Sequence, residues 1–306
     1  MLSELVAKTL KPVLSDAAWN RLRHLDPRAR GRDERAAKDE ALQAARQAAR
    51  REAKATEERE RAAADLSTRS LTELAQHFKT DKWGRHRYTP HYERHLSHLK
   101  NTSFTLFEIG IGGYANSGEG GASLRMWKEF FPRAQILGLD IEDKSFVDAE
   151  RIRSYVGSQV DEELLHRIVA EADNLQVVID DGSHRSEHIV QTFAMLFPLL
   201  PLGGIYVIED TQTSYWEKYG GSLDLDTPGT SMNMVKQMLD GLNYEEYAPH
   251  DYEPTYSELH VVGVHAYHNL VFIEKGLNNE EEEFRRIRVV RAARAAATAP
   301  TPDPAS

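Results

Sequence analysis

Cysteine is absent from this 306-residue sequence. The chain therefore cannot form a disulfide, a thiolate nucleophile, an iron–sulfur cluster or a cysteine-based zinc site. Any metal ion has to be held by oxygen and nitrogen atoms. Long apolar runs are also lacking, since no stretch approaches the ~20 apolar residues of a membrane span and charges interrupt the N-terminal segment, unlike a secretory signal. We therefore expect a cytoplasmic protein.

Positive charge is scarce in most of the chain. Residues 1–66 carry 15 Lys and Arg against 12 Asp and Glu, a net charge of +3, whereas residues 67–306 carry 23 against 36, a net charge of −13. An acidic domain repels phosphate backbones. We therefore expect no nucleic-acid partner.

The composition divides the chain into three parts. Residues 1–66 form a charged helical extension, in which an amphipathic segment precedes an alanine-rich helix without an apolar stripe. Residues 67–276 mix aliphatic and aromatic side chains and form the folded domain. Residues 277–306 form a charged tail that cannot bury enough apolar surface to become ordered. Residues 1–64 could dock onto a membrane surface, bind a partner protein, or do neither.

Short apolar runs alternate with helical patterns in the domain. The predicted strands are residues 103–109, 135–140, 152–156, 175–179 and 204–208, and the predicted helices are residues 122–131, 161–172 and 187–200. This alternation predicts an α/β fold with a parallel sheet. Residues 259–264 and 269–274 predict a final hairpin, which adds an antiparallel edge.

Ligands of such sheets bind at the carboxyl ends of the strands. The first predicted strand runs into a glycine-rich turn at Gly110 and Gly112, where a ligand can approach the backbone closely. The second ends at Asp140, where a carboxylate can accept hydrogen bonds from two ribose hydroxyls. Ser158 and Gln159, after the third strand, lie in a turn that could place a polar side chain against an adenine. Together these features predict a nucleoside ligand.

Acidic residues end the next two strands. Asp180 and Asp181 follow the fourth strand, and Glu209 and Asp210 follow the fifth. So many carboxylates at one edge repel one another unless a cation neutralises them, and oxygen ligands favour Mg²⁺, Mn²⁺ or Ca²⁺. His184 follows closely, and its imidazole, with a reference pKa of ~6.5, is suited to take a proton from a hydroxyl beside such a cation.

These residues resemble those of class I S-adenosylmethionine-dependent methyltransferases, and in particular the metal-dependent sugar O-methyltransferases of the mycinamicin (macrolide) type. The similarity extends from about Leu71 to Gly276 and leaves out the first 64 residues. The general motifs are residues 106–113, Asp140, 178–184 and 206–210. The more specific stretches are residues 79–84, 88–92, 123–127 and 268–270.

The resemblance implies a Rossmann-like, seven-stranded, mostly parallel sheet with an antiparallel last strand. It also implies Mg²⁺-dependent transfer of a methyl group from S-adenosylmethionine to a sugar hydroxyl. The acceptor would be a glycosylated natural product or a cell-surface glycan. Enzymes of this type form oligomers whose neighbouring subunits help to close the site, so the resemblance implies a homo-oligomer.

The resemblance also assigns roles to individual residues. The implied cofactor-binding residues are Glu108, Gly110, Gly112, Ser123, Asp140, Ser158, Gln159 and Asp180, the last without a defined contact. The implied magnesium ligands are Asp181, Glu209 and Asp210, and His184 is the implied general base. Lys82 and Tyr88 belong to a segment that would cap the active site.

Two other functions remain open from the sequence. A NAD-dependent oxidoreductase also uses a glycine loop and an acid after the second strand, although hydride transfer has no use for the acidic cluster. A non-catalytic scaffold would use the N-terminal helical arm as its working part and the sheet as a support.

Overall fold

The structure is a computed structural model, and it describes residues 14–18, 30–113, 118–249 and 251–279. The chain divides into two units, residues 1–68 and 69–306. The predicted amphipathic segment at residues 1–26 lies mostly outside the described residues, as does the tail from residue 280 onward.

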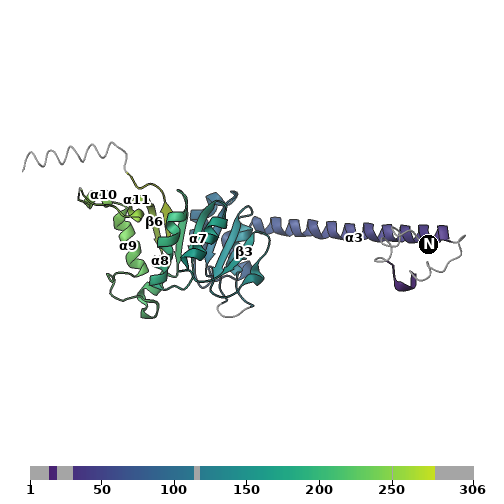
Figure 1. Ribbon diagram of the computed structural model, residues 1–306, viewed down its shortest axis with the longest axis horizontal. Coiled ribbons are helices and arrows are strands. Elements are labelled where there is room, and N and C mark those ends of the chain that lie inside the picture. Colours follow the sequence, from purple (N-terminus) through teal and green to yellow (C-terminus); the bar gives the residue numbers. More distant parts are fainter. Residues whose placement is uncertain (1–13, 19–29, 114–117, 250, 280–306) are drawn as a thin grey trace, which may run out of the picture. The chain divides into compact units, whose positions relative to one another are not determined.

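The first unit contains one long helix, α3 (Arg30–Ser67), drawn in purple and blue in Figure 1. The predicted alanine-rich helix lies within it. Its described side chains between residues 40 and 57 are almost all exposed, and even Leu42 is 49% exposed. This helix is therefore solvated, as its composition predicts. In the described parts of the chain, no helix is both long and apolar enough to cross a membrane.

The second unit is built on a seven-stranded sheet with the order β3-β2-β1-β4-β5-β7-β6. Its strands are β1 (Thr105–Ile109), β2 (Gln135–Asp140), β3 (Ile152–Val156), β4 (Leu175–Asp180), β5 (Ile205–Glu209), β6 (Val261–Tyr267) and β7 (Leu270–Lys275). The first five run parallel, and β7 is antiparallel to both β5 and β6. The predicted mostly parallel sheet with a reversed last strand is confirmed.

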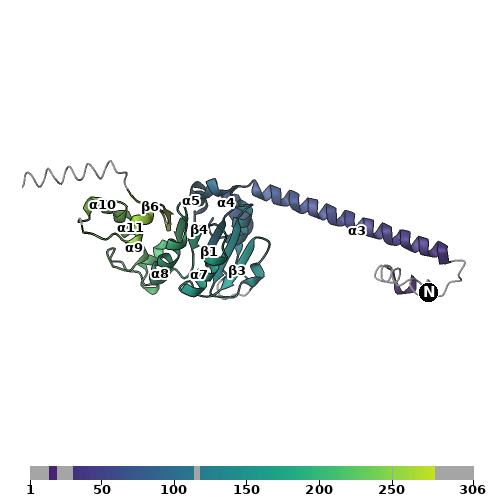
Figure 2. The ribbon, with the colours of Figure 1, turned by 45° about the horizontal axis from the view of Figure 1, so that its top comes forward.

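Helices cover both faces of the sheet. The helices of this unit are α4 (Leu71–Phe78), α5 (Thr89–Leu96), α6 (Ala122–Phe130), α7 (Glu162–Glu171), α8 (Ser186–Leu196), α9 (Ser231–Gly241), α10 (Tyr244–Tyr247) and α11 (Tyr256–His260). Figure 2 shows α4 and α5 above the strands and α7 and α8 below them. Because side chains alternate along a strand, Phe107 and Ile109 pack with α7 and α8, whereas Glu108 faces Trp127 of α6.

Several predicted boundaries differ from the observed ones, and two of these errors have clear local reasons. The predicted helix at residues 187–200 ends at Leu196 and continues only as a 3-10 turn, because Pro198 cannot donate the backbone hydrogen bond of an α-helix. The strand predicted from Leu259 begins at Val261. The preceding residues instead form α11, where Thr255 and Glu258 make a reciprocal capping box.

A second capping box positions the functional site. The capping signal predicted between residues 67 and 73 is the pair Ser70 and Glu73 at the start of α4, where the Glu73 carboxylate accepts from the Ser70 amide at 2.9 Å. At the other end, Lys79 adopts a left-handed conformation and stops the helix. The chain then enters the loop that carries Lys82.

Candidate active site

A buried lysine lies at the centre of the site. Lys82 Nζ lies 3.0 Å from Glu108 Oε1, 3.0 Å from Asp181 Oδ2 and 2.6 Å from Glu209 Oε1. These acids come from the carboxyl ends of β1, β4 and β5, which are neighbours in the sheet. Burial opposes the charge of Lys82, but the charges of Asp181, Glu108 and Glu209 outweigh burial and raise its pKa well above the usual range.

The two innermost carboxylates receive further hydrogen bonds. Trp127 Nε1 donates to Glu108 Oε2 at 3.1 Å, and Tyr92 Oη donates to Glu209 Oε1. Burial raises the pKa of Glu108, and burial together with the charge of Asp181 raises that of Glu209 well above its usual value. The Lys82 ammonium group therefore neutralises part of the acidic cluster. It was the repulsion within this cluster that predicted a metal ion from the sequence.

An outer group of three side chains faces more open surroundings. Ligand atoms of Asp181, His184 and Asp210 all lie within 4.8 Å of one another, and their side chains are 21%, 26% and 18% exposed. His184 Nε2 is 3.8 Å from Asp210 Oδ2. Carboxylate and imidazole groups at this spacing can bind a divalent cation or exchange a proton.

Asp210 is held in its ionised form. Tyr88 Oη donates to Asp210 Oδ1 at 2.7 Å, and His86 Nε2 lies 3.7 Å from the same oxygen. Burial tends to raise the pKa of Asp210, but the Tyr88 hydrogen bond and the charges of His184 and His86 outweigh it and lower the pKa. Asp210 therefore presents a negative charge to His184 at neutral pH.

The backbone is strained at both of these positions. His184 and Asp210 adopt φ angles of 56° and 53°, in the left-handed region that side chains other than glycine rarely occupy. Such a conformation costs about 1 to 3 kcal/mol and persists only where surrounding contacts impose it. At both strand ends it turns the chain abruptly after the sheet.

Asp180 and Gln159 support the turn that carries His184. Gln159 Nε2 donates to Asp180 Oδ1 at 3.1 Å, and Gln159 Oε1 accepts from the Ser183 amide at 2.7 Å. Tyr206 Oη also donates to Asp180, at 3.3 Å. Asp180 is 1% exposed, and burial raises its pKa to about 6. Both residues, predicted to bind the cofactor, have their contacts within the protein.

The glycine turn lies beside these strand ends. A Cβ atom on Gly110 would lie 2.0 Å from the Asp181 carbonyl oxygen, so only glycine lets the β1 loop approach the end of β4. At Gly112, with φ at 75°, a Cβ would meet nothing within 4 Å. The Asp140 carboxylate accepts from the amides of Ile111 at 3.1 Å and Glu142 at 3.0 Å, which fix it beside this turn.

The remaining predicted residues are placed as follows. Ser123 is 8% exposed at the start of α6 and hydrogen-bonds to Glu108. Ser158 accepts from the Val160 amide at 3.3 Å. Lys82 and Tyr88, expected in a segment capping the site, are only 1% and 2% exposed and lie inside it, because their polar atoms pair with the carboxylates of Glu209 and Asp210.

Three residues of the site were not predicted from the sequence. Tyr92 and Trp127 lie in stretches that carry the family resemblance, and that was their only signal. His86 stacks on Tyr88 with ring centroids 4.7 Å apart, and its buried Nε2 has no hydrogen-bond partner. No pattern in the sequence connects His86 with Asp210, which lies more than a hundred residues away.

The outer group, Asp181, His184 and Asp210, is better suited to bind a hard divalent cation than the inner carboxylates around Lys82. The inner position among Glu108, Asp181 and Glu209 is filled by the Lys82 ammonium group. Asp181 retains Oδ1 and Asp210 retains Oδ2 as oxygen donors beside His184, and Mg²⁺ prefers such donors.

No protein-family model matches the chain. Individual related sequences nevertheless match the chain. It is 48% identical over 217 residues to demethylmacrocin O-methyltransferase of Streptomyces fradiae, covering 69% of this chain and 54% of that protein. It is 47% identical over 214 residues to mycinamicin VI 2''-O-methyltransferase of Micromonospora griseorubida, covering 69% and 53%. The chain thus spans about half the length of these relatives.

Two solved structures similar to this chain come from the same group of enzymes as the related sequences. The methyltransferase MycE of the mycinamycin biosynthetic pathway, in complex with Mg and SAH, superposes with a TM-score of 0.67 and 43% identity, covering 74% of this chain and 60% of that one. The MycE complex that also contains mycinamycin VI gives a TM-score of 0.65 and 45% identity, covering 70% and 57%. The chain therefore belongs to the class I methyltransferases, and its homologues include the sugar O-methyltransferases of macrolide biosynthesis.

Proposed function

We propose that this protein transfers a methyl group from S-adenosylmethionine to a sugar hydroxyl in a Mg²⁺-dependent reaction. The observation that carries the proposal is the convergence of Asp181, His184 and Asp210 at the carboxyl edge of the sheet. The Asp140 carboxylate and the open backbone at Gly112 lie at the same edge, so a nucleoside site adjoins a cation and proton-acceptor site.

The nucleoside site has features that suit S-adenosylmethionine. SAH, present in the MycE structures, is what remains of S-adenosylmethionine after its methyl group has left. Asp140, already oriented by two backbone amides, would accept hydrogen bonds from the ribose hydroxyls. Gly112 leaves room for the methionine part, while Ser158 adjoins the position proposed for the adenine.

Asp181 and Asp210 would hold Mg²⁺ from the rim of the site, and Glu209 would approach with the oxygen that Lys82 and Tyr92 leave free. When no ion is bound, the ammonium group of Lys82 keeps Asp181 and Glu209 in place, because its positive charge offsets their mutual repulsion. When bound, Mg²⁺ would lower the pKa of the sugar hydroxyl, and S-adenosylmethionine would supply the methyl group.

His184 would accept the proton of the sugar hydroxyl as the oxygen attacks. An alkyl hydroxyl is a poor nucleophile unless a base removes this proton. The Asp210 carboxylate, 3.8 Å from His184 Nε2, stabilises the positive charge that the imidazole then acquires. The Tyr88 hydrogen bond holds Asp210 in place, and His86 Nε2 lies 3.7 Å from the same carboxylate.

The proposed acceptor is a glycosylated natural product, because relatives act in macrolide and tetracenomycin pathways, with a cell-surface glycan as the other possibility. A homo-oligomer, a cytoplasmic location and docking of residues 1–64 on a membrane or partner protein are further parts of the proposal that await experiment. The domain boundaries at 66/67 and 276/277 likewise stay a prediction.

A methyl-transfer assay tests the proposal. The full chain is incubated with S-adenosylmethionine labelled in its methyl group and with mycinamicin VI as a probe glycoside, with Mg²⁺ or with chelator. We expect Mg²⁺-dependent labelling of the sugar, and a rate about 10² to 10⁴ times lower in His184→Asn. His166→Asn is the matched control, because His166 is exposed on α7.

The chelator arm of this assay, together with separate binding titrations of NAD and of S-adenosylmethionine, distinguishes the other candidate functions. If chelator does not change the labelling of the sugar, the proposed dependence on Mg²⁺ is wrong. Binding of NAD without methyl transfer supports the oxidoreductase, and binding of neither nucleotide supports the scaffold.

A further inference from the structure

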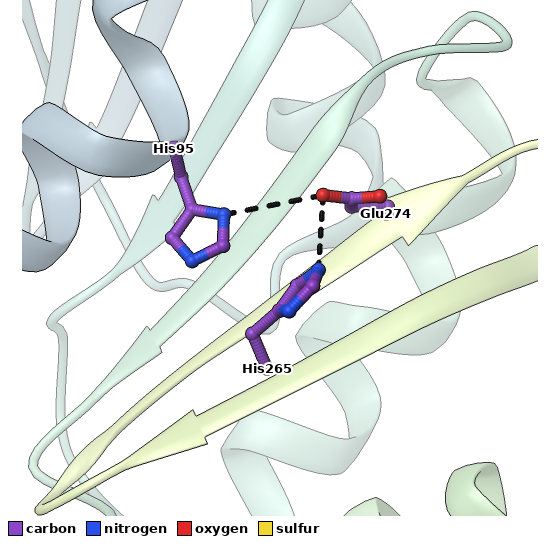
Figure 3. A group of neighbouring side chains, drawn as sticks. All are labelled: His95, His265 and Glu274. Atoms are coloured by element: carbon purple, nitrogen blue, oxygen red, sulfur yellow. Dashed lines mark hydrogen bonds and ion pairs between the residues drawn. The ribbon is translucent and has the colours of Figure 1, made fainter.

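Two histidines and a glutamate form a cluster away from the site described above. His95 lies in the last turn of α5, His265 on the edge strand β6 and Glu274 on β7. Figure 3 shows the three side chains converging, with both imidazole rings directed toward one carboxylate oxygen. His265 Nε2 lies 3.0 Å and His95 Nδ1 lies 3.9 Å from Glu274 Oε1.

We propose that His95, His265 and Glu274 form a second metal site, which binds Zn²⁺ and fastens α5 to the β6–β7 hairpin. Zinc is bound by imidazole nitrogen and carboxylate oxygen at about 2.0 to 2.2 Å, so tetrahedral ligand atoms lie roughly 3.3 to 3.5 Å apart. The two imidazole–carboxylate distances, 3.0 and 3.9 Å, lie on either side of that spacing, and all three ligand atoms lie within 4.8 Å of one another.

The cluster also has the surroundings of a metal site. His95 Nε2 lies 2.9 Å from Tyr267 Oη. A histidine that binds a metal through Nδ1 ordinarily donates its other ring N–H to such a partner, which fixes the ring. The His95 ring is further held by stacking on Phe272, with centroids 4.4 Å apart. His95 is therefore presented to the ion in one orientation.

The backbone leaves space for this arrangement. Gly263 of β6 lies opposite Glu274 of β7, and a Cβ on Gly263 would be 3.0 Å from Glu274 Oε2 and 3.4 Å from His265 Nε2. A side chain there would press on the Glu274 carboxylate. The side chains of His265 and Glu274 are each 40% exposed, so water can complete the coordination of the ion.

The site would act through α5, whose Tyr92 binds Glu209 in the carboxylate cluster. Zinc would thus stabilise the helix that lines the proposed active site without taking part in the chemistry.

The test is zinc titration of the untagged full chain by calorimetry, with Mg²⁺ at saturating concentration to occupy the outer group at Asp181. We expect one zinc ion to bind and the melting temperature to rise. His265→Gln and Glu274→Gln should each weaken binding more than about 100-fold, since loss of a ligand exceeds the 10- to 100-fold effect expected of Tyr267→Phe at the outer partner.

His98→Gln is the matched control, because His98 is exposed just after α5 and lies outside the cluster. It should bind zinc as the unmodified chain does. Visible absorption of tetrahedral Co²⁺ that disappears in His265→Gln but not in His98→Gln would identify the ligands. If the unmodified chain binds no zinc under these conditions, or if His265→Gln and Glu274→Gln bind it equally well, the cluster is an ion pair without a metal and the proposal is wrong.

Discussion

Replacing Lys82 by methionine tests the account of the buried charges. Methionine keeps much of the volume of the lysine stem, so the change removes chiefly the ammonium group and its contacts at 2.6, 3.0 and 3.0 Å with three carboxylates. Breaking a buried ion pair by removing one partner costs about 3 to 5 kcal/mol, because the other charge stays buried without compensation. We expect Lys82→Met to lower the free energy of unfolding by that amount at pH 8.

The loss should depend on pH in a definite direction. Without the ammonium group, the folded-state pKa values of Glu108 and Glu209, already raised by burial, rise further. A carboxyl group with a raised folded-state pKa stabilises the fold below its unfolded pKa of ~4.3, and this stabilisation is lost as the pH rises through the folded-state value. The deficit of the variant should therefore be smaller at pH 5 than at pH 8.

The assay is urea denaturation at both pH values. Lys218→Met is the control, since Lys218 is exposed and its substitution should change the free energy by less than about 0.5 kcal/mol. Equal unfolding midpoints for Lys82→Met and Lys218→Met at pH 8 would refute the reasoning.

Three further predictions concern the same edge of the sheet. Asp180, whose pKa is raised to about 6 by burial, contributes stability that is fully present below pH ~4 and is lost, by up to about 3 kcal/mol, as the pH rises from about 4 to about 6, so Asp180→Asn should flatten the pH dependence of unfolding between about pH 4 and 6. Gly110→Ala should lower the melting temperature by several degrees because its Cβ would strike Asp181, whereas Gly112→Ala should fold and weaken S-adenosylmethionine binding in calorimetry. In steady-state methyl transfer, Asp181→Asn should lose more activity than His184→Asn, because positioning contributes ~7 to 11 kcal/mol and a general base only ~10² to 10⁴-fold; an equal or larger loss for His184→Asn would contradict this ranking.

The sheet could be predicted from the sequence because its central strands are buried on both faces. Such strands appear as short continuous apolar runs between turn residues, and the runs at 135–140 and 175–179 fall on β2 and β4. Two of the boundary errors fall at the end of α8 and the start of β6, where a proline and a capping box decide the boundary locally.

The meeting of Asp181, His184 and Asp210 could also be predicted, because the ends of neighbouring parallel strands share one edge. The place of Lys82 could not. It lies 99 residues from Asp181 and 127 from Glu209, and only the packing of the α4–α5 loop against the sheet brings them together. The charge pattern of the sequence predicts that the acidic residues are neutralised by a cation, but it does not distinguish a lysine side chain from a metal ion.

The most direct test of the central claim is calorimetric titration of S-adenosylmethionine and of NAD into the full chain, each with Mg²⁺. The account predicts that one S-adenosylmethionine binds and NAD does not. It also predicts that Asp140→Asn weakens binding about 10- to 100-fold, as expected for lost hydrogen bonds to a charged group, while the exposed neighbour Glu142→Gln leaves binding unchanged. Binding of NAD instead, or of neither nucleotide, would contradict the methyltransferase account.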